Sequence, residues 1–221
     1  MKKKYILLLA AGVLGISAAV GGTLAAGNVE SKTVLQEISE KSLGISIVSG
    51  YTDTHGYGKT NIEVMPGKKQ SLRYRMVNDR EDGYDLYARV HLYFQWTPET
   101  LMQKETVNHY MMPVLQGKTF PLVKDYEHQT TMGDWIVAYC DSTEVVMYYT
   151  KPMACGDSVP FLDAVSFSEQ MGNAYAGASF DLQVEVDAVQ ANQSQDAIAA
   201  EWGVFPKIKQ GVIVRVSETR E

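Results

Sequence analysis

Four histidines, His55, His91, His109 and His128, are the residues of this 221-residue chain best suited to metal binding or acid–base catalysis. None of them lies in an HExxH motif, in which two imidazoles one helical turn apart hold a zinc ion. His128 follows Glu127, but no further ligand stands beside this pair in the sequence. We therefore expect a structural or surface role for each histidine, and we predict no catalytic residue, no metal ligand and no cofactor.

The acidic stretch from Asn78 to Asp85 is the best candidate for a calcium loop, because oxygen ligands on a tight turn suit calcium. Arg80 interrupts the order of ligands that an EF-hand requires, and no closing glutamate follows at the needed distance. A solvated turn between two strands is the favoured interpretation. The chain also contains neither a GxSxG nucleophile elbow nor a glycine-rich phosphate loop after a strand.

Cys140 and Cys155 are the two cysteines of the chain. Residues 134–140 and 145–149 are predicted to form the arms of a hairpin, with Cys140 near its turn and Cys155 beyond the far end of the second arm. This arrangement predicts a separation above the ~7 Å that a disulfide allows between Cα atoms. Two separate thiols are the favoured prediction, although an oxidising compartment would permit a disulfide.

The N-terminus has the pattern of a cleavable secretory leader over residues 1–26. Three lysines precede an uncharged run from Tyr5 to Val20, and small residues follow up to Ala26. An uncleaved anchor helix is the alternative, but the apolar run is shorter than the ~20 residues that span a bilayer. We expect a secreted protein of the extracellular matrix or cell surface that meets the membrane only transiently, through its leader.

The charge of the chain is acidic, with a formal net charge of -6 at pH 7. The leader carries three lysines and no acid, so the remaining residues carry -9. An acidic surface argues against nucleic acid or anionic lipid as a partner. The roughly 195 residues from 27 to 221 fit a single domain with its own core.

Period-two alternation of apolar residues dominates the chain, which is typical of strands. It is strongest over residues 87–96 and 180–189, and it recurs in the segments 43–47, 62–64, 72–76, 135–139, 145–149 and 212–216. Helical spacing is limited to the three short segments 33–42, 98–108 and 193–202. These elements predict an all-β fold, a jelly-roll-like β-sandwich with short helices in its loops.

Several stretches together resemble one known family. They are the leader MKKKYILLLAAGVLGISAAVGGTLA, the segment RYRMVNDREDGYDLYARVHLYFQW, the tryptophan, tyrosine-pair and GDSVP block between 133 and 160, and FDLQVEVDAVQANQSQDAIAAEWGV. In this order they are similar to the TasA/camelysin family of exported bacterial matrix proteins, whose leaders are removed by a SipW-type signal peptidase.

This resemblance implies a jelly-roll sandwich that polymerises with itself and other matrix subunits into biofilm fibres. Assembly in the family uses donor-strand addition, in which the mature N-terminus of one subunit joins a sheet of the next. The corresponding segment here comprises Gly27, Asn28, Val29, Glu30, Ser31, Lys32 and Thr33. It departs from the aromatic residue and Thr/Ser-Asp run common in the family, but Val29, Ser31 and Thr33 could still alternate as a strand.

Two other functions stay open. A monomeric adhesin or ligand-binding sandwich would use the insert between Trp96 and Trp135 as its binding surface. A metallo-endopeptidase, suggested by the camelysin name, would require His109, His128 and Glu127 to converge on one metal ion. Because no catalytic motif is found, we expect a structural protein rather than an enzyme.

Overall fold

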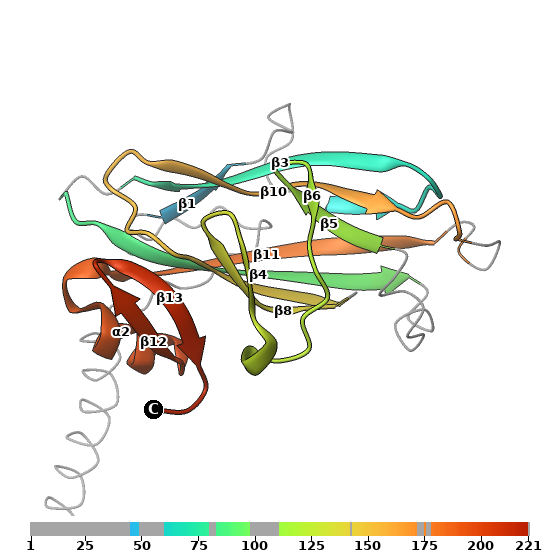
Figure 1. Ribbon diagram of the computed structural model, residues 1–221. Coiled ribbons are helices and arrows are strands. Elements are labelled where there is room, and N and C mark those ends of the chain that lie inside the picture. The colour runs from blue at the N-terminus through green and yellow to red at the C-terminus, as the bar shows by residue number, and fades with distance from the viewer. Residues whose placement is uncertain are drawn as a thin grey trace, which may run out of the picture.

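The computed structural model describes residues 45–48, 60–79, 83–97, 111–141, 143–171, 175 and 178–220. These residues form two antiparallel sheets packed face to face, with a small C-terminal unit against the outer face of one of them (Figure 1). The chain crosses repeatedly from one sheet to the other, as in a jelly roll. The predicted all-β sandwich is therefore confirmed. No helix in the described residues is long and apolar enough to cross a membrane.

One layer is a five-stranded sheet in the order β1-β3-β10-β5-β6. Its strands are β1 (Ile45–Val48), β3 (Lys69–Asn78), β10 (Ser158–Phe167), β5 (Met111–Leu115) and β6 (Lys118–Thr119). The other layer is a six-stranded sheet in the order β2-β11-β4-β9-β8-β7. Its strands are β2 (Thr60–Glu63), β11 (Ser179–Gln190), β4 (Leu86–Thr97), β9 (Glu144–Tyr149), β8 (Trp135–Cys140) and β7 (Thr130–Met132).

The centre of the six-stranded sheet is the pairing of β4 with β11, which runs without a register shift over all twelve residues of each strand. On β4 the side chains of Ala88, Val90, Leu92, Phe94 and Trp96 are buried in the core, as the alternation predicted. Leu182, Val184 and Val186 of β11 enter the same core cluster. Burying such side chains stabilises the fold by about 1.5–3 kcal/mol each.

Two bulges interrupt the pairing of β3 with β10. Leu72 and Arg73 lie opposite Asp163 alone, and Phe161 is an extra residue on β10. Arg73 adopts a left-handed backbone with φ 55, which a bulge can impose on a residue other than glycine. The bulges place neighbouring residues of β10, such as Phe161 and Leu162, both in the core.

The C-terminal unit consists of η5 (Ala191–Gln193), α2 (Ser194–Trp202) and the hairpin of β12 (Phe205–Lys209) with β13 (Val212–Ser217). It packs against the face of the six-stranded sheet that points away from the sandwich core (Figure 1). Tyr87, Tyr148, Ile198, Trp202 and Ile213 belong to a second apolar cluster between them.

Most elements predicted from the sequence are present. The hairpin of β8 and β9 and helix α2 match their predicted segments closely. The predicted helices 33–42 and 98–108 lie outside the described residues. Strands β5, β6, β7, β10 and β12 were not predicted.

Candidate functional site

The segment predicted to donate a strand, Gly27–Thr33, lies outside the described residues, as do the leader, His55 and His109. What the structure describes is the surface that could receive such a strand. The four strands at the edges of the two sheets are β1, β2, β6 and β7, and each has only two to four residues. Short edge strands limit unwanted pairing with other chains.

Among the described strands, one long strand is paired on one side over only part of its length. β2 pairs only with Ser179–Leu182, the first four residues of β11. The next eight residues of β11, Gln183–Gln190, pair with β4 on one side and with no described strand on the other. We call this side of residues 183–190 the open edge.

The pairing register of β11 with β2 and β4 determines which main-chain N–H and C=O groups point toward the open edge. Val64 N donates to Ala178 O at 2.9 Å, across the pairing that continues into β2 and β11. In an antiparallel pair, residues that exchange main-chain hydrogen bonds recur at every second position. The unbroken register therefore directs the main-chain N–H and C=O of Val184, Val186 and Ala188 toward the open edge, while their side chains face the core.

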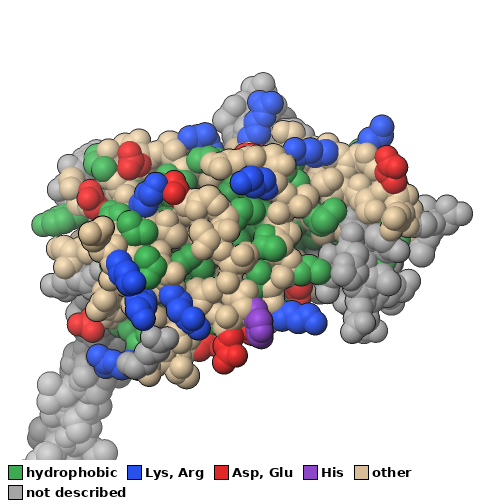
Figure 2. Space-filling model, viewed as in Figure 1, with side chains coloured by type: hydrophobic (Ala, Val, Ile, Leu, Met, Phe, Trp, Pro, Cys, Tyr) green, Lys and Arg blue, Asp and Glu red, His purple; other side chains and the backbone are tan. Residues whose placement is uncertain are grey.

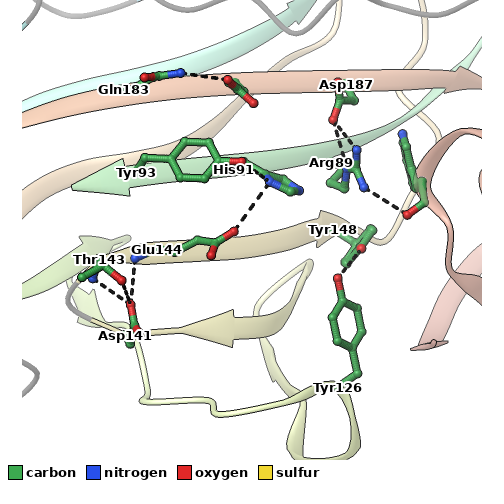
Figure 3. Close-up of polar contacts among 12 residues, drawn as sticks. Arg89, His91, Tyr93, Tyr126, Asp141, Thr143, Glu144, Tyr148, Gln183 and Asp187 are labelled. Atoms are coloured by element: carbon green, nitrogen blue, oxygen red, sulfur yellow. Dashed lines mark hydrogen bonds and ion pairs between the residues drawn. The ribbon is translucent and has the colours of Figure 1, made fainter. Parts of the chain in front are cut away.

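A polar cluster occupies the outer face of the same sheet (Figure 3). His91 Nδ1 lies 3.0 Å from the Tyr93 hydroxyl and 4.0 Å from Glu144 Oε1. The other ring nitrogen of His91, Nε2, is buried and has no hydrogen-bond partner within the described part of the chain. The predicted place of His91, on the more polar face of its strand, is correct, and its side chain is only 17% exposed.

Burial determines the protonation of this cluster. It lowers the pKa of His91 to about 4, with a further contribution from the positive charge of Arg89. Burial, together with the negative charges of Glu185 and Glu144, raises the pKa of Tyr93 to about 12. His91 and Tyr93 are therefore both neutral at pH 7. His91 is a weak base there, which does not favour general-base catalysis.

Arg89 connects this face to the C-terminal unit. Its Nε and Nη2 donate to Asp187 Oδ2 at 3.0 and 2.6 Å, and Nη1 donates to Trp202 O at 3.3 Å. The guanidinium also lies 5.4 Å from the centre of the Trp202 ring, a cation–π distance. Each of the paired side chains of Arg89 and Asp187 is only 15% exposed. This contact is structural, because it joins α2 to β4 and β11.

The neighbouring tyrosines Tyr148 and Tyr149 pack against tryptophan rings. Tyr148 is fully buried, its ring centre lies 5.6 Å from that of Trp202, and its hydroxyl lies 3.0 Å from that of Tyr126. Tyr149 is half-buried and its ring packs against Trp135.

The cysteines are separate, as predicted. Cys140 is buried at the end of β8, Cys155 is exposed in a turn, and no disulfide joins them. Burial raises the pKa of the Cys140 thiol to about 12, so this thiol is unreactive at neutral pH.

The metal-binding candidates do not form a site within the described residues, where no three His, Cys, Asp or Glu side chains are grouped to hold a metal ion. Asn78 is buried, and its side-chain amide donates to the carbonyls of Met153 and Tyr84 at 2.8 and 3.2 Å, so it fixes a turn. His128 is bound to Asp125 at 2.7 Å on the surface.

The open edge was missed by sequence reasoning, since it depends on which strands pair and over how many residues. The alternation that includes Val184 and Val186 predicted only a strand with one face in the core.

A comparison with protein-family models, curated proteins and solved structures gives no significant match.

Proposed function

We propose that this protein is a secreted, non-enzymatic subunit of an extracellular fibre, and that neighbouring subunits join by strand addition at the open edge of β11. The observation that carries the proposal is the row of main-chain groups on Val184, Val186 and Ala188, directed away from β4. In strand addition, such groups supply the affinity and the side chains of alternate residues supply the specificity.

The dimensions of the proposed donor suit this edge. At about 3.3 Å per residue, the seven residues Gly27–Thr33 extend over about 23 Å, close to the length of the eight-residue open edge. Val184, Val186 and Ala188 could each exchange two hydrogen bonds with a donor. At about 0.5–1.5 kcal/mol net for each bond, these contacts are enough to contribute several kcal/mol.

The proposed contact is head-to-tail. The donor lies near the N-terminus and the acceptor lies on β11, so each subunit uses two different surfaces. A contact of this kind produces a filament unless its rotation closes a ring. Self-association into a fibre therefore needs no second protein, although other matrix subunits with a similar N-terminus could enter the same edge.

The test compares the protein that begins at Gly27 with a variant in which residues 27–33 are replaced by a Gly/Ser segment of equal length. Electron microscopy and sedimentation velocity follow both chains under identical conditions. We expect filaments from the first chain and monomers from the second. A synthetic peptide of residues 27–36 should bind the Gly/Ser variant, whereas a scrambled peptide should not.

Two results would contradict the proposal. Filaments of equal abundance from both chains would show that residues 27–33 are not the donor. A protein beginning at Gly27 that remains monomeric at all concentrations would instead favour the alternative, a monomeric adhesin or ligand-binding sandwich.

A further inference from the structure

The strands of the two sheets carry opposite net charges. Those of the five-stranded sheet contain four cations and one acid, a formal charge of +3; these residues are Lys69, Arg73, Arg75, Lys118 and Asp163. Those of the six-stranded sheet contain one cation and five acids, a formal charge of -4; these residues are Arg89, Glu63, Glu144, Asp181, Glu185 and Asp187. The acidic character of the chain is therefore not shared by the five-stranded sheet.

A row of cations lies on the outer face of the five-stranded sheet. Leu72 and Met76 of β3 are buried in the core, so the alternate side chains of this strand point outward. We call the exposed residues Lys69, Arg73 and Arg75 of this row the basic face. Figure 2 shows Lys and Arg side chains along the upper margin of the molecule, where Figure 1 places β3.

The contacts of the basic face leave its positive charge in place. Arg75 Nε donates to the Ser158 hydroxyl at 2.9 Å, and Nη2 donates to Ser158 O at 2.8 Å, so its partner is neutral. Lys69 and Arg73 form no ion pair within the described residues. Asp163, the one acid in these strands, accepts a hydrogen bond from the main-chain N–H of Gln116 at 2.6 Å.

Three acids lie on the outer face of the six-stranded sheet. We call them the acidic face, and they are Glu63, Glu144 and Glu185. Their neighbours Ile62, Val145 and Val184 are buried in the core, so the three carboxylates point outward. Glu63 is exposed and the side chain of Glu144 is 36% exposed.

The C-terminal unit covers a different part of this outer face. It packs over Tyr87 and Val189, which pair near one end of the sheet. Glu144 pairs with Tyr93, further along β4, and Glu63 pairs with the first residue of β11. Figure 1 shows β4 and β11 extending well beyond the C-terminal unit. A partner can therefore approach the acidic face beside this unit.

The two faces lie on opposite sides of the sandwich, so each of them matches the other face of a second copy. Complementary charges steer association and fix its register. At about 0.1 M salt the Debye length is about 10 Å, so charges that meet across a contact still attract each other. The net charge of -6 on the whole chain is spread over larger distances and is largely screened.

We propose that the basic face of one subunit binds the acidic face of a second copy of this chain, so that sandwiches stack sheet against sheet. Each subunit uses two different faces, so stacking can continue. Stacking uses side chains, whereas strand addition uses main-chain groups of the open edge, so the two contacts are independent. Exposed ion pairs are individually weak, so single subunits stack only at high protein concentration. In a fibre the contacts repeat, and together they would hold neighbouring fibres side by side.

The test uses the full chain in which residues 27–33 are replaced by a Gly/Ser segment, because strand addition is absent from it. In a concentrated solution, sedimentation equilibrium should show reversible association at about 0.1 M salt and monomers at about 1 M salt, where the Debye length is about 3 Å. K69E/R73E reverses the basic face and E63K/E185K reverses the acidic face. Each variant alone should associate about tenfold more weakly than the parent chain. Their equimolar mixture should recover association, because each variant supplies the face that the other has lost.

K124E/K209E is the matched control, since it makes the same charge change at exposed lysines outside the two sandwich sheets and should associate as the parent chain does. An equal loss in this control would overturn the proposal, as would a monomeric mixture or a parent chain that stays monomeric at every concentration. Heparin bound by a chain that stays monomeric would assign the basic face to an anionic polymer instead. Strand addition is tested separately, by the filaments of the chain that begins at Gly27.

Discussion

His91 is a neutral histidine inside a polar cluster, and this state has a consequence for the stability of the fold. Its folded pKa is about 4, against an ordinary value of 6.5. Below pH 6.5 the unfolded chain therefore takes up a proton at His91 that the folded chain does not bind until the pH approaches 4. The unfolded state binds more protons in this range, so the free energy of unfolding decreases as the pH falls.

We predict that H91Q makes the protein less sensitive to acid. A shift of this size corresponds to about 3.5 kcal/mol when it is complete, at about 1.4 kcal/mol for each pKa unit. The decrease in unfolding free energy between pH 7 and pH 4.5, measured by urea denaturation, should be about 2–3 kcal/mol smaller in the variant. Glu144 and Tyr93 remain in place, so only the titration of His91 is removed.

H128Q is the matched control, because the side chain of His128 is 74% exposed and its ion pair with Asp125 is screened by solvent. The acid sensitivity of this variant should remain close to that of the unchanged protein. If H91Q and H128Q alter the pH dependence equally, the burial of His91 does not determine it.

At the scale of elements, one side chain of the loop before β7 attaches β13 to the sandwich. Gln129 Nε2 donates to Val216 O at 2.7 Å, and Val216 N donates to Gln129 Oε1 at 3.0 Å. The amide of Gln129 thus binds β13 as the main chain of a neighbouring strand would. Tyr87 adds a second attachment, since its hydroxyl donates to Gly211 O at 2.6 Å.

We predict that Q129A loosens the C-terminal hairpin while the sandwich stays folded. Two hydrogen bonds to Val216 are lost, and each contributes about 0.5–1.5 kcal/mol. Hydrogen exchange of the β12 and β13 amides should therefore become about tenfold faster, whereas exchange in β4 and β11 should not change. T131A, on the exposed face of β7, is the control. Faster exchange in every strand would contradict this prediction.

The elements differ in how well the sequence predicts them. β4 and β11 alternate without interruption, because their pairing contains no bulge. β10 does not alternate, since its bulges bury Phe161 and Leu162 together. The turn between β12 and β13 can be recognised in the sequence by Gly211, because glycine favours positive φ. Gln210 and Gly211 both have positive φ, which this two-residue hairpin turn requires.

At the scale of the whole molecule, the open edge is a stretch of eight residues on the long strand β11. It is longer than any of the four edge strands, which have two to four residues each. A donor strand would lie beside Gln183–Gln190 and would add a further strand to the six-stranded sheet. The main chain of Glu185 is directed toward β4, so an added strand would meet Glu185 at a position without main-chain hydrogen bonds. Such positions bring the Cα atoms of an antiparallel pair to about 4.5 Å.

We predict that cysteines placed at Glu185 and in the donor segment form disulfides between subunits. E185C is combined in turn with N28C, V29C and E30C, in a C155S background that removes the exposed thiol. Mild oxidation should give a ladder of covalent oligomers for at least one pair, as seen by electrophoresis without reductant. A Cα separation within about 4.4–6.8 Å is needed for this reaction.

T131C replaces E185C in the control, because β7 is the edge strand on the opposite side of the sheet. This control should give no ladder with any donor cysteine. Ladders from both acceptors would indicate random collision, and their absence from E185C under conditions that give filaments would place the contact elsewhere.

The pairing of β4 with β11 also bears on how quickly the protein folds. His91 lies opposite Glu185, so the two central strands are separated by roughly 90 residues of chain. Closing so long a loop carries an entropy cost of about (3/2)RT ln n before any contact compensates for it. Sheets dominated by such distant pairings fold in milliseconds to seconds rather than microseconds. Until β11 has formed, β4 has no neighbour on that side, and folding is expected to wait for almost the last strand.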